Sequence, residues 1–201
     1  MSSKNVLIIL LTITAGLLLS FTLHFRNKST AIESNKQLLS EQIATMSVKA
    51  FGFDLNKTMT GKKVPDIVGI TRDNDEKYLS ELLNGRPILI YRYTQVGGCR
   101  PCYERQIRLI QEIFKNSLQS VVILATYGNR RDFRISAGNN VSGIPMFHIS
   151  ADAFDWQFEQ SGIPYYFVLH PCMRISNIYV PNEREPELSR QYLESIKRLL
   201  Q

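Results

Sequence analysis

The sequence predicts an α/β protein with a mixed central β-sheet flanked by helices, preceded by one N-terminal transmembrane helix. Apolar runs rich in β-branched and aromatic residues alternate with segments whose apolar residues recur at helical spacing, which is typical of a sheet covered on both faces. The last two apolar runs are joined by a tight turn at 170–174, which fits an antiparallel pair, whereas the longer connections fit crossovers between parallel strands.

The first element is an apolar segment from Val6 to Phe25. Twenty helical residues at about 1.5 Å each span roughly 30 Å, the thickness of a bilayer core. Ser29-Thr30-Ala31 offers a cleavage-like spacing, but the apolar run is longer than the core of an ordinary signal peptide and basic residues precede that site. We therefore expect an uncleaved signal-anchor over residues 1–26. An anchor and a cleaved signal peptide both place the rest of the chain outside the cytoplasm, although nearly balanced flanking charges define the orientation only weakly.

Residues 27–49 are polar with apolar residues at loosely helical intervals, which predicts a polar helical stalk. The apolar pattern lasts too few heptads to support a coiled-coil dimer. The domain follows at 50–201. A net charge of +6 and 21% charged residues are normal for a folded domain. The cluster of Arg130, Arg131 and Arg134 comes without a nucleic-acid-binding motif and indicates a solvated helix face, so we expect no nucleic-acid partner.

The domain opens with a turn into an edge strand at 67–70, where Pro65 is tolerated at the strand entry. A short helix is expected at 78–83, ended by Asn84-Gly85 and Pro87. The β-branched and aromatic residues at 88–93 then predict a buried strand. The remaining elements are expected in this order: a helix beginning near residue 99, a strand at 120–126, a polar helix or loop at 129–140, a short strand at 146–149, a helical turn at 154–158, strands at 165–169 and 175–180, and a final amphipathic helix with Leu188, Tyr192, Ile196, Leu199 and Leu200 on one face.

The candidate site is Cys99-Arg100-Pro101-Cys102, between the buried strand and the helix that follows it. Two thiols at this spacing can close into a disulfide or bind a metal, and the context favours redox chemistry. A cysteine near a helix N-terminus has its thiolate stabilised by unpaired N–H groups and by the helix dipole. Pro101 fits the first helical turn, where its missing N–H costs nothing. Arg100 adds a positive charge, so the arrangement predicts a reactive dithiol.

The chain resembles the membrane-anchored thioredoxin-like proteins of the bacterial envelope, the group that includes cytochrome c-maturation and peroxiredoxin-related redoxins. The resemblance rests on Val64-Pro65-Asp66, on Gly85-Arg86-Pro87 before the buried strand, on the cysteine pair, and on Gly162-Ile163-Pro164 before the Tyr165 strand. It implies a thioredoxin-like fold and thiol–disulfide oxidoreductase activity, in which Cys99 attacks and Cys102 resolves.

The same resemblance implies that Pro164 is a cis-proline facing the dithiol, with the backbone of Ile163 free to pair with an extended substrate segment. Gly143-Ile144-Pro145 is the competing candidate, but it leaves too many elements behind it for the family layout.

Three positions depart from the family pattern. Gly98 replaces the aromatic residue that commonly precedes the first cysteine, and Ile107 replaces the helix-kinking proline. Tyr93 stands where thioredoxins place a buried carboxylate. Proton transfer to or from Cys102 then needs water, Tyr93 or the nearby Glu104. Together with Arg100, these two residues are the candidates for tuning the pKa of the dithiol.

The sequence has no nicotinamide or flavin fingerprint, so no cofactor is expected beyond the redox-active disulfide. Electrons must arrive through another protein's thiols, and we expect a membrane thiol electron donor. The expected clients are proteins with disulfides, and the predicted direction is reduction of those disulfides. The expected location is the bacterial cell envelope, with the chain anchored in the inner membrane and its domain on the periplasmic side.

Three other functions compete with this interpretation. A thiol peroxidase needs a Pro and a Thr or Ser at fixed positions before the attacking cysteine, where this chain has Arg92 and Val96. A zinc or copper site would combine the two cysteines with His170 and Cys172, but five strand residues place His170 roughly 17 Å from the dithiol, so no metal is expected. The third alternative is a non-catalytic binding module, but the intact cysteine pair argues against it.

Overall fold

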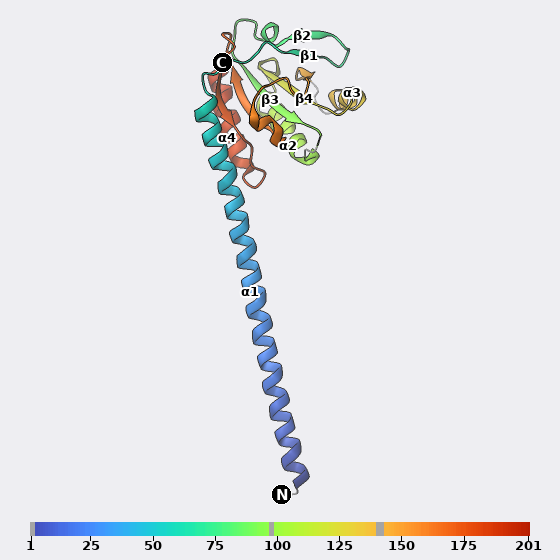
Figure 1. Ribbon diagram of the computed structural model, residues 1–201, viewed down its shortest axis with the longest axis vertical. Coiled ribbons are helices and arrows are strands. Elements are labelled where there is room, and N and C mark those ends of the chain that lie inside the picture. The colour runs from blue at the N-terminus through green and yellow to red at the C-terminus, as the bar shows by residue number, and fades with distance from the viewer. Residues whose placement is uncertain (1–2, 97–98, 140–142) are drawn as a thin grey trace. The chain divides into compact units, whose positions relative to one another are not determined.

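The protein is represented by a computed structural model, which describes residues 3–96, 99–139 and 143–201, with only part of the side chains before residue 32. The chain divides into two compact units, residues 1–46 and 47–201, which are described separately. Helix α1 (Ser3–Met59) contributes to both units, and Figure 1 labels it together with several elements of the domain.

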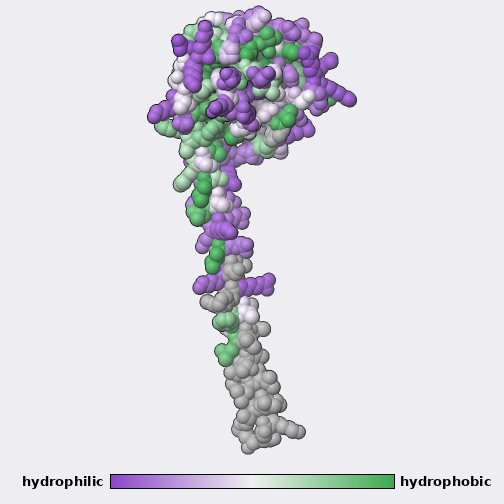
Figure 2. Space-filling model, in the orientation of Figure 1, coloured by the Kyte–Doolittle hydropathy of each residue, from purple (hydrophilic) through white to green (hydrophobic). Residues whose placement is uncertain are grey.

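The first unit consists of α1 as far as Met46. Figure 2 shows hydrophobic and hydrophilic side chains along the described part of this helix, and the apolar side chains of Leu39 and Ile43 are exposed. Most side chains of the predicted anchor at 1–26 lie outside the described residues. Within the described part of the chain, no helix combines the length and apolar character that crossing a membrane requires.

The second unit contains a sheet in the order β2-β1-β5-β4-β3-β6-β7. The central strands β3, β4 and β5 are parallel, and the strands toward both edges pair antiparallel, as expected for a mixed sheet. The strands are β1 (Val68–Ile70), β2 (Glu76–Tyr78), β3 (Ile88–Thr94), β4 (Val121–Thr126), β5 (Met146–His148), β6 (Tyr165–Leu169) and β7 (Ile175–Tyr179).

The alternation of side chains along β3 divides the core into two layers. Leu89, Tyr91 and Tyr93 point to the face covered by three α-helices, where α2 and α4 lie next to each other (Figure 1). Ile88 and Ile90 point to the opposite face. The helices of the domain are α2 (Arg100–Ile113), α3 (Arg130–Asn139) and α4 (Pro186–Leu200), and the short 3₁₀ helices are η1 (Leu79–Leu82), η2 (Leu118–Ser120) and η3 (Gln157–Ser161).

The opposite face is covered partly by the end of α1, which the sequence interpretation missed. Leu55 and Met59 are buried there, and Asn56 Oδ1 accepts the backbone N–H of Ile178 at 2.8 Å. The helix therefore continues well beyond the residue near 51 at which the domain was expected to begin.

The helix expected at 78–83 is wrong in part. Tyr78 ends β2, whose three residues are all exposed and give no apolar signal, and only a single 3₁₀ turn follows. The turn is short because Asn84 and Gly85 both have positive φ and turn the chain away before a second turn can form.

Candidate active site at the start of α2

The two cysteines lie at the N-terminus of α2 and are joined in a disulfide, with their Cα atoms 5.2 Å apart. Cys99 is the N-cap residue, and its carbonyl accepts the N–H groups of Cys102 and Tyr103 at 3.1 and 3.3 Å. Pro101 occupies the first turn, as predicted. Cys99 is exposed and Cys102 is half-buried, so the first sulfur is the one open to another molecule. Gly98, which stands where the family commonly has an aromatic residue, lies outside the described residues.

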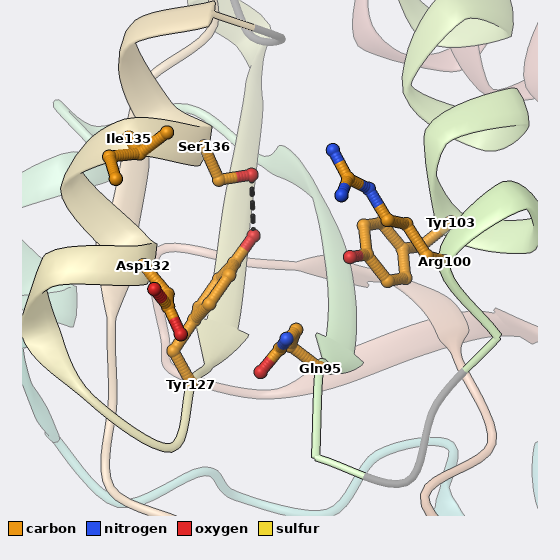
Figure 3. A pocket seen from close by; sticks show the side chains of 7 residues that line it. All are labelled: Gln95, Arg100, Tyr103, Tyr127, Asp132, Ile135 and Ser136. Atoms are coloured by element: carbon orange, nitrogen blue, oxygen red, sulfur yellow. Dashed lines mark hydrogen bonds between the residues drawn. The ribbon is translucent and has the colours of Figure 1, made fainter.

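The positive charge of Arg100 is shared with a carboxylate. Arg100 Nε donates to Glu104 Oε1 at 2.8 Å, one helical turn later, and this bond raises the pKa of Arg100. Figure 3 shows Arg100 and Tyr103 facing Tyr127 and Ser136 across a pocket of about 300 Å³. Two of the three residues predicted to tune the dithiol therefore bind each other, and their opposite charges largely cancel at a distance.

Tyr93, the third candidate, is tied into a tyrosine cluster. Its hydroxyl is 2.7 Å from that of Tyr127, which donates in turn to Ser136 at 2.7 Å (the second bond is drawn in Figure 3). Its ring stacks on Tyr103 with centroids 4.5 Å apart. Burial, followed by the neighbouring Tyr127, raises the pKa of Tyr93 far above its ordinary range. A phenol that stays neutral and is already hydrogen-bonded is a poor proton acceptor for the dithiol.

Sequence reasoning missed the carboxylate that actually lies at the sulfurs. Glu183, in the loop between β7 and α4, places Oε1 3.7 Å from Cys99 Sγ. It is separated from Cys99 by 84 positions and stands in no motif. Only the packing of α4 beside α2 brings this loop to the start of α2. No sequence signal would have identified it.

Ile163 and Pro164 lie at the same end of the sheet as the start of α2. Tyr165 pairs with Arg92 of β3, so the two residues before Tyr165 run beside the C-terminal end of that strand. Ile163 is 40% exposed, and its backbone N–H donates to Ser161 Oγ at 3.4 Å. Their predicted role in substrate binding remains a prediction.

The expectation of a cis-proline is wrong. The described residues contain no cis peptide bond, and the Ile163–Pro164 bond is trans. Gly162 ends η3 in the left-handed conformation, with φ 66° and ψ 8°, and this residue makes the reversal into β6. The chain therefore enters β6 without a cis bond.

A second, larger pocket of about 830 Å³ lies on the other side of the end of β3. It is lined by Thr94 and Val96 before the cysteines and by Gly162 before Ile163. Aromatic and acidic side chains from 154–159, including Trp156 and Asp155, complete it. The pocket therefore lies next to the segment that precedes the cysteines and next to the segment that precedes Ile163, the two parts of the predicted site.

The described residues contain one group of three possible metal ligands, namely Cys99, Cys102 and Glu183, whose ligand atoms lie within 4.8 Å of one another. The form of cysteine that binds metal is the thiolate. In the structure the two sulfurs are joined in a disulfide. His170 instead contacts Ser176 at 2.8 Å, and Cys172 is a free exposed thiol in the β6–β7 turn.

No family model and no curated protein matches this chain, but solved structures do. It is similar to the thioredoxin domain of a thiol-disulfide oxidoreductase from Bacteroides vulgatus, with 15% identity and a TM-score of 0.52 over 71% of this chain and 98% of that one. A thiol:disulfide interchange protein from a Bacteroides species shares 17% identity, with a TM-score of 0.50 over 70% of this chain and 90% of that one. A thioredoxin-family thiol:disulfide interchange protein from Chlorobium tepidum TLS shares 16% identity, with a TM-score of 0.50 over 70% and 96%.

Identities this low show the fold alone. The domain has a thioredoxin-like α/β fold, and it carries a disulfide-bonded cysteine pair at the N-terminus of its α2 helix. This confirms the predicted fold of the domain.

Proposed function

We propose that this protein is a thiol–disulfide oxidoreductase that reduces disulfides in client proteins through Cys99 and Cys102. The observation that carries the proposal is the disulfide itself, which joins an exposed and a half-buried sulfur at a helix N-terminus of a thioredoxin-like fold. This position favours a nucleophilic thiolate at Cys99, whereas the half-buried Cys102 is less accessible to other molecules.

In the proposed reaction, the Cys99 thiolate attacks one sulfur of a client disulfide and releases the other client sulfur as a thiolate. Cys102 then attacks Cys99 in the mixed disulfide, which releases the second client thiol and leaves the Cys99–Cys102 disulfide. The client gains two electrons and two protons, which the dithiol loses. Thiols of another protein return the pair to its reduced form.

The pocket beside Thr94 and Gly162 is the proposed place where a client segment lies during this exchange. Val96, which lines it, and Ile163, which follows Gly162, are both exposed, and Trp156 supplies an apolar wall. An extended client segment there would run past the backbone of Ile163 toward Cys99.

Reduction of insulin by the full chain, with dithiothreitol as the electron source, tests the activity. We expect the Cys172→Ser variant to reduce insulin as the natural chain does, because Cys172 lies outside the site. Cys99→Ser should abolish the activity, and Cys102→Ser should accumulate a mixed disulfide between Cys99 and insulin. If Cys99→Ser stays active, or if the Cys172→Ser chain is inactive in its folded state, the proposed function is wrong.

We further propose that residues 1–26 anchor the chain in the inner membrane of a bacterial envelope, with the domain on the periplasmic side and a membrane thiol protein as electron donor. The apolar run from Val6 to Phe25 supports this arrangement. Exposed Cys172 gives a natural reporter in a chain whose active cysteines are replaced by serine. A membrane-impermeant maleimide should label it in intact spheroplasts, whereas labelling only after lysis would place the domain in the cytoplasm.

A further inference from the structure

A carboxylate from a distant loop lies against the dithiol. Glu183 Oε1 is 3.7 Å from Cys99 Sγ, and both sulfurs lie within 4.8 Å of a Glu183 oxygen and of each other. In the disulfide, the sulfur has no proton to donate. After reduction, the Cys99 thiol can donate to this carboxylate, so the contact has chemical consequences in the dithiol state.

The loop that carries Glu183 is held on both sides. Asn182 is buried, and its Oδ1 accepts the backbone N–H of Arg184 at 3.1 Å. Its Nδ2 donates to Glu185 at 3.4 Å, and the Glu185 carboxylate pairs with Lys49 at 2.7 Å. These bonds restrain the loop before and after Glu183.

The other acid–base candidates near the pair are engaged elsewhere. Glu104 holds Arg100, and the hydroxyl of Tyr93 is bound to Tyr127. Among the described residues, Glu183 makes no ion pair, and it is the carboxylate that touches the exposed sulfur.

The charge of Glu183 also affects a buried tyrosine. The hydroxyl of Tyr91, on β3 beneath α2, is buried without a hydrogen-bond partner among the described residues. Burial raises the pKa of Tyr91, and the negative charge of Glu183 raises it further. The titratable and charged groups around the pair are Arg100, Tyr103 and Glu104 on α2, Tyr91 on β3, and Glu183, Arg184 and the Lys49–Glu185 pair at the loop before α4.

We propose that Glu183 is a catalytic residue that takes the proton from the Cys99 thiol during attack, and that its negative charge disfavours the resting Cys99 thiolate and so makes the pair a stronger reductant. This inference rests on the proposed function. The Cys99 thiol passes its proton to Glu183, its sulfur bonds to one client sulfur, the client S–S bond breaks, and the departing thiolate takes that proton back from Glu183. Cys102 then passes its proton to the freed Glu183 carboxylate and bonds to Cys99, the mixed disulfide breaks, and the second client thiolate takes this proton from Glu183.

The charge effect follows from the balance between thiolate and disulfide. A like charge within about 4–6 Å disfavours the charged form of a titrating group. A less stable thiolate makes the reduced state less stable relative to the disulfide, and the pair becomes a stronger reductant. In strong disulfide oxidants the reduced form is instead stabilised. The helix N-terminus stabilises the Cys99 thiolate and the Glu183 charge destabilises it. The two effects together determine the reduction potential of the Cys99–Cys102 pair.

The test compares Glu183→Gln with Glu187→Gln in the full-length Cys172→Ser chain. Both changes remove one exposed carboxylate near the start of α4, but Glu187 points to Arg190 at 4.0 Å and not to the sulfurs. The first measurement is the pH dependence of iodoacetamide alkylation at Cys99 in the reduced protein. For Glu183→Gln we expect the half-maximal rate at a pH lower by about one unit. The second is the equilibrium with glutathione, which should move about tenfold toward the reduced protein, or about 30 mV.

Glu187→Gln should match its Cys172→Ser parent in both measurements. An unshifted Glu183→Gln profile, or an equal shift in Glu187→Gln, overturns the role of Glu183. Failure of the proposed function has a different signature, because the parent itself would then form no Cys99–Cys102 disulfide at any glutathione ratio.

Discussion

At the scale of single residues, the domain buries an ion pair between Arg92 and Glu159 beneath the larger pocket. The two side chains are 3% and 7% exposed, and Arg92 Nη2 lies 2.7 Å from the Glu159 carboxylate. Tyr165 also donates to Glu159, and Arg92 donates to the carbonyl of Tyr93 at 2.6 Å. Burial of a charge costs several kcal/mol, so the pair is tolerable only with its hydrogen bonds complete.

We expect Arg92→Met to lower the free energy of unfolding by about 3–5 kcal/mol, because it leaves the Glu159 charge buried without its partner. Urea denaturation of the full chain measures the loss. The double variant Arg92→Met, Glu159→Leu removes both charges and should recover part of the stability. Equal losses in the single and double variants would contradict this explanation.

The same scale separates what the sequence reveals about the site from what it hides. The cysteine pair and Pro101 are local patterns that can be found by their spacing, and the segment at Ile163 is expected from the family resemblance. Glu183 acts at the site only because α4 packs beside α2, and Tyr93 and Glu104 are engaged by partners that no spacing predicts. Long-range polar contacts are therefore what the sequence interpretation lacks.

At the scale of elements, α4 is the helix that holds the Glu183 loop next to α2. Leu193 is fully buried against the α2 face of the sheet, whereas Leu199 on the same helix is 54% exposed. Leu193→Ala should therefore destabilise the domain by about 2–5 kcal/mol, by loss of burial and creation of a cavity. Leu199→Ala is the matched control and should change the urea midpoint little. Similar midpoint shifts in both variants would mean that α4 is not docked as the structure has it.

Most helices and strands could be predicted from the sequence, because the spacing of apolar residues in buried strands and amphipathic helices follows the positions that are buried. The strands at 121–126 and 165–169 and the final helix illustrate this. β2 was not predicted because all three of its residues are exposed. The part of α1 that belongs to the domain was not predicted because no break in the helix separates it from the polar stalk. The cis-proline at Pro164 was expected from the family resemblance alone. The bond is trans, and the left-handed Gly162 makes the turn into the strand.

At the scale of the whole molecule, tyrosines occupy much of the centre of the domain. Burial is the first cause that raises the pKa of Tyr91, Tyr165 and Tyr166 well above its ordinary value. Because the folded pKa is raised, these phenols contribute their full stability below about pH 10, the unfolded value, and lose it as pH rises above that.

Alkaline solution should therefore unfold the domain cooperatively. Each such tyrosine is expected to remove about 1.4 kcal/mol per pH unit above about pH 10. Urea midpoints should fall steeply in this range, and the phenolate absorbance of the buried rings should rise together with the loss of circular dichroism. If most of that absorbance appears while the circular dichroism is still native, the rings are not buried as the structure has them.

The disulfide closes a short ring between the N-cap residue of α2 and its first turn. By loop entropy, so small a ring contributes only about 2 kcal/mol, against the roughly 5–15 kcal/mol that an ordinary domain has in total. In the proposed reaction, opening and closing this disulfide therefore changes the stability of the domain only slightly. A partner protein that distinguishes the reduced from the oxidised form then has to recognise the few atoms around Cys99.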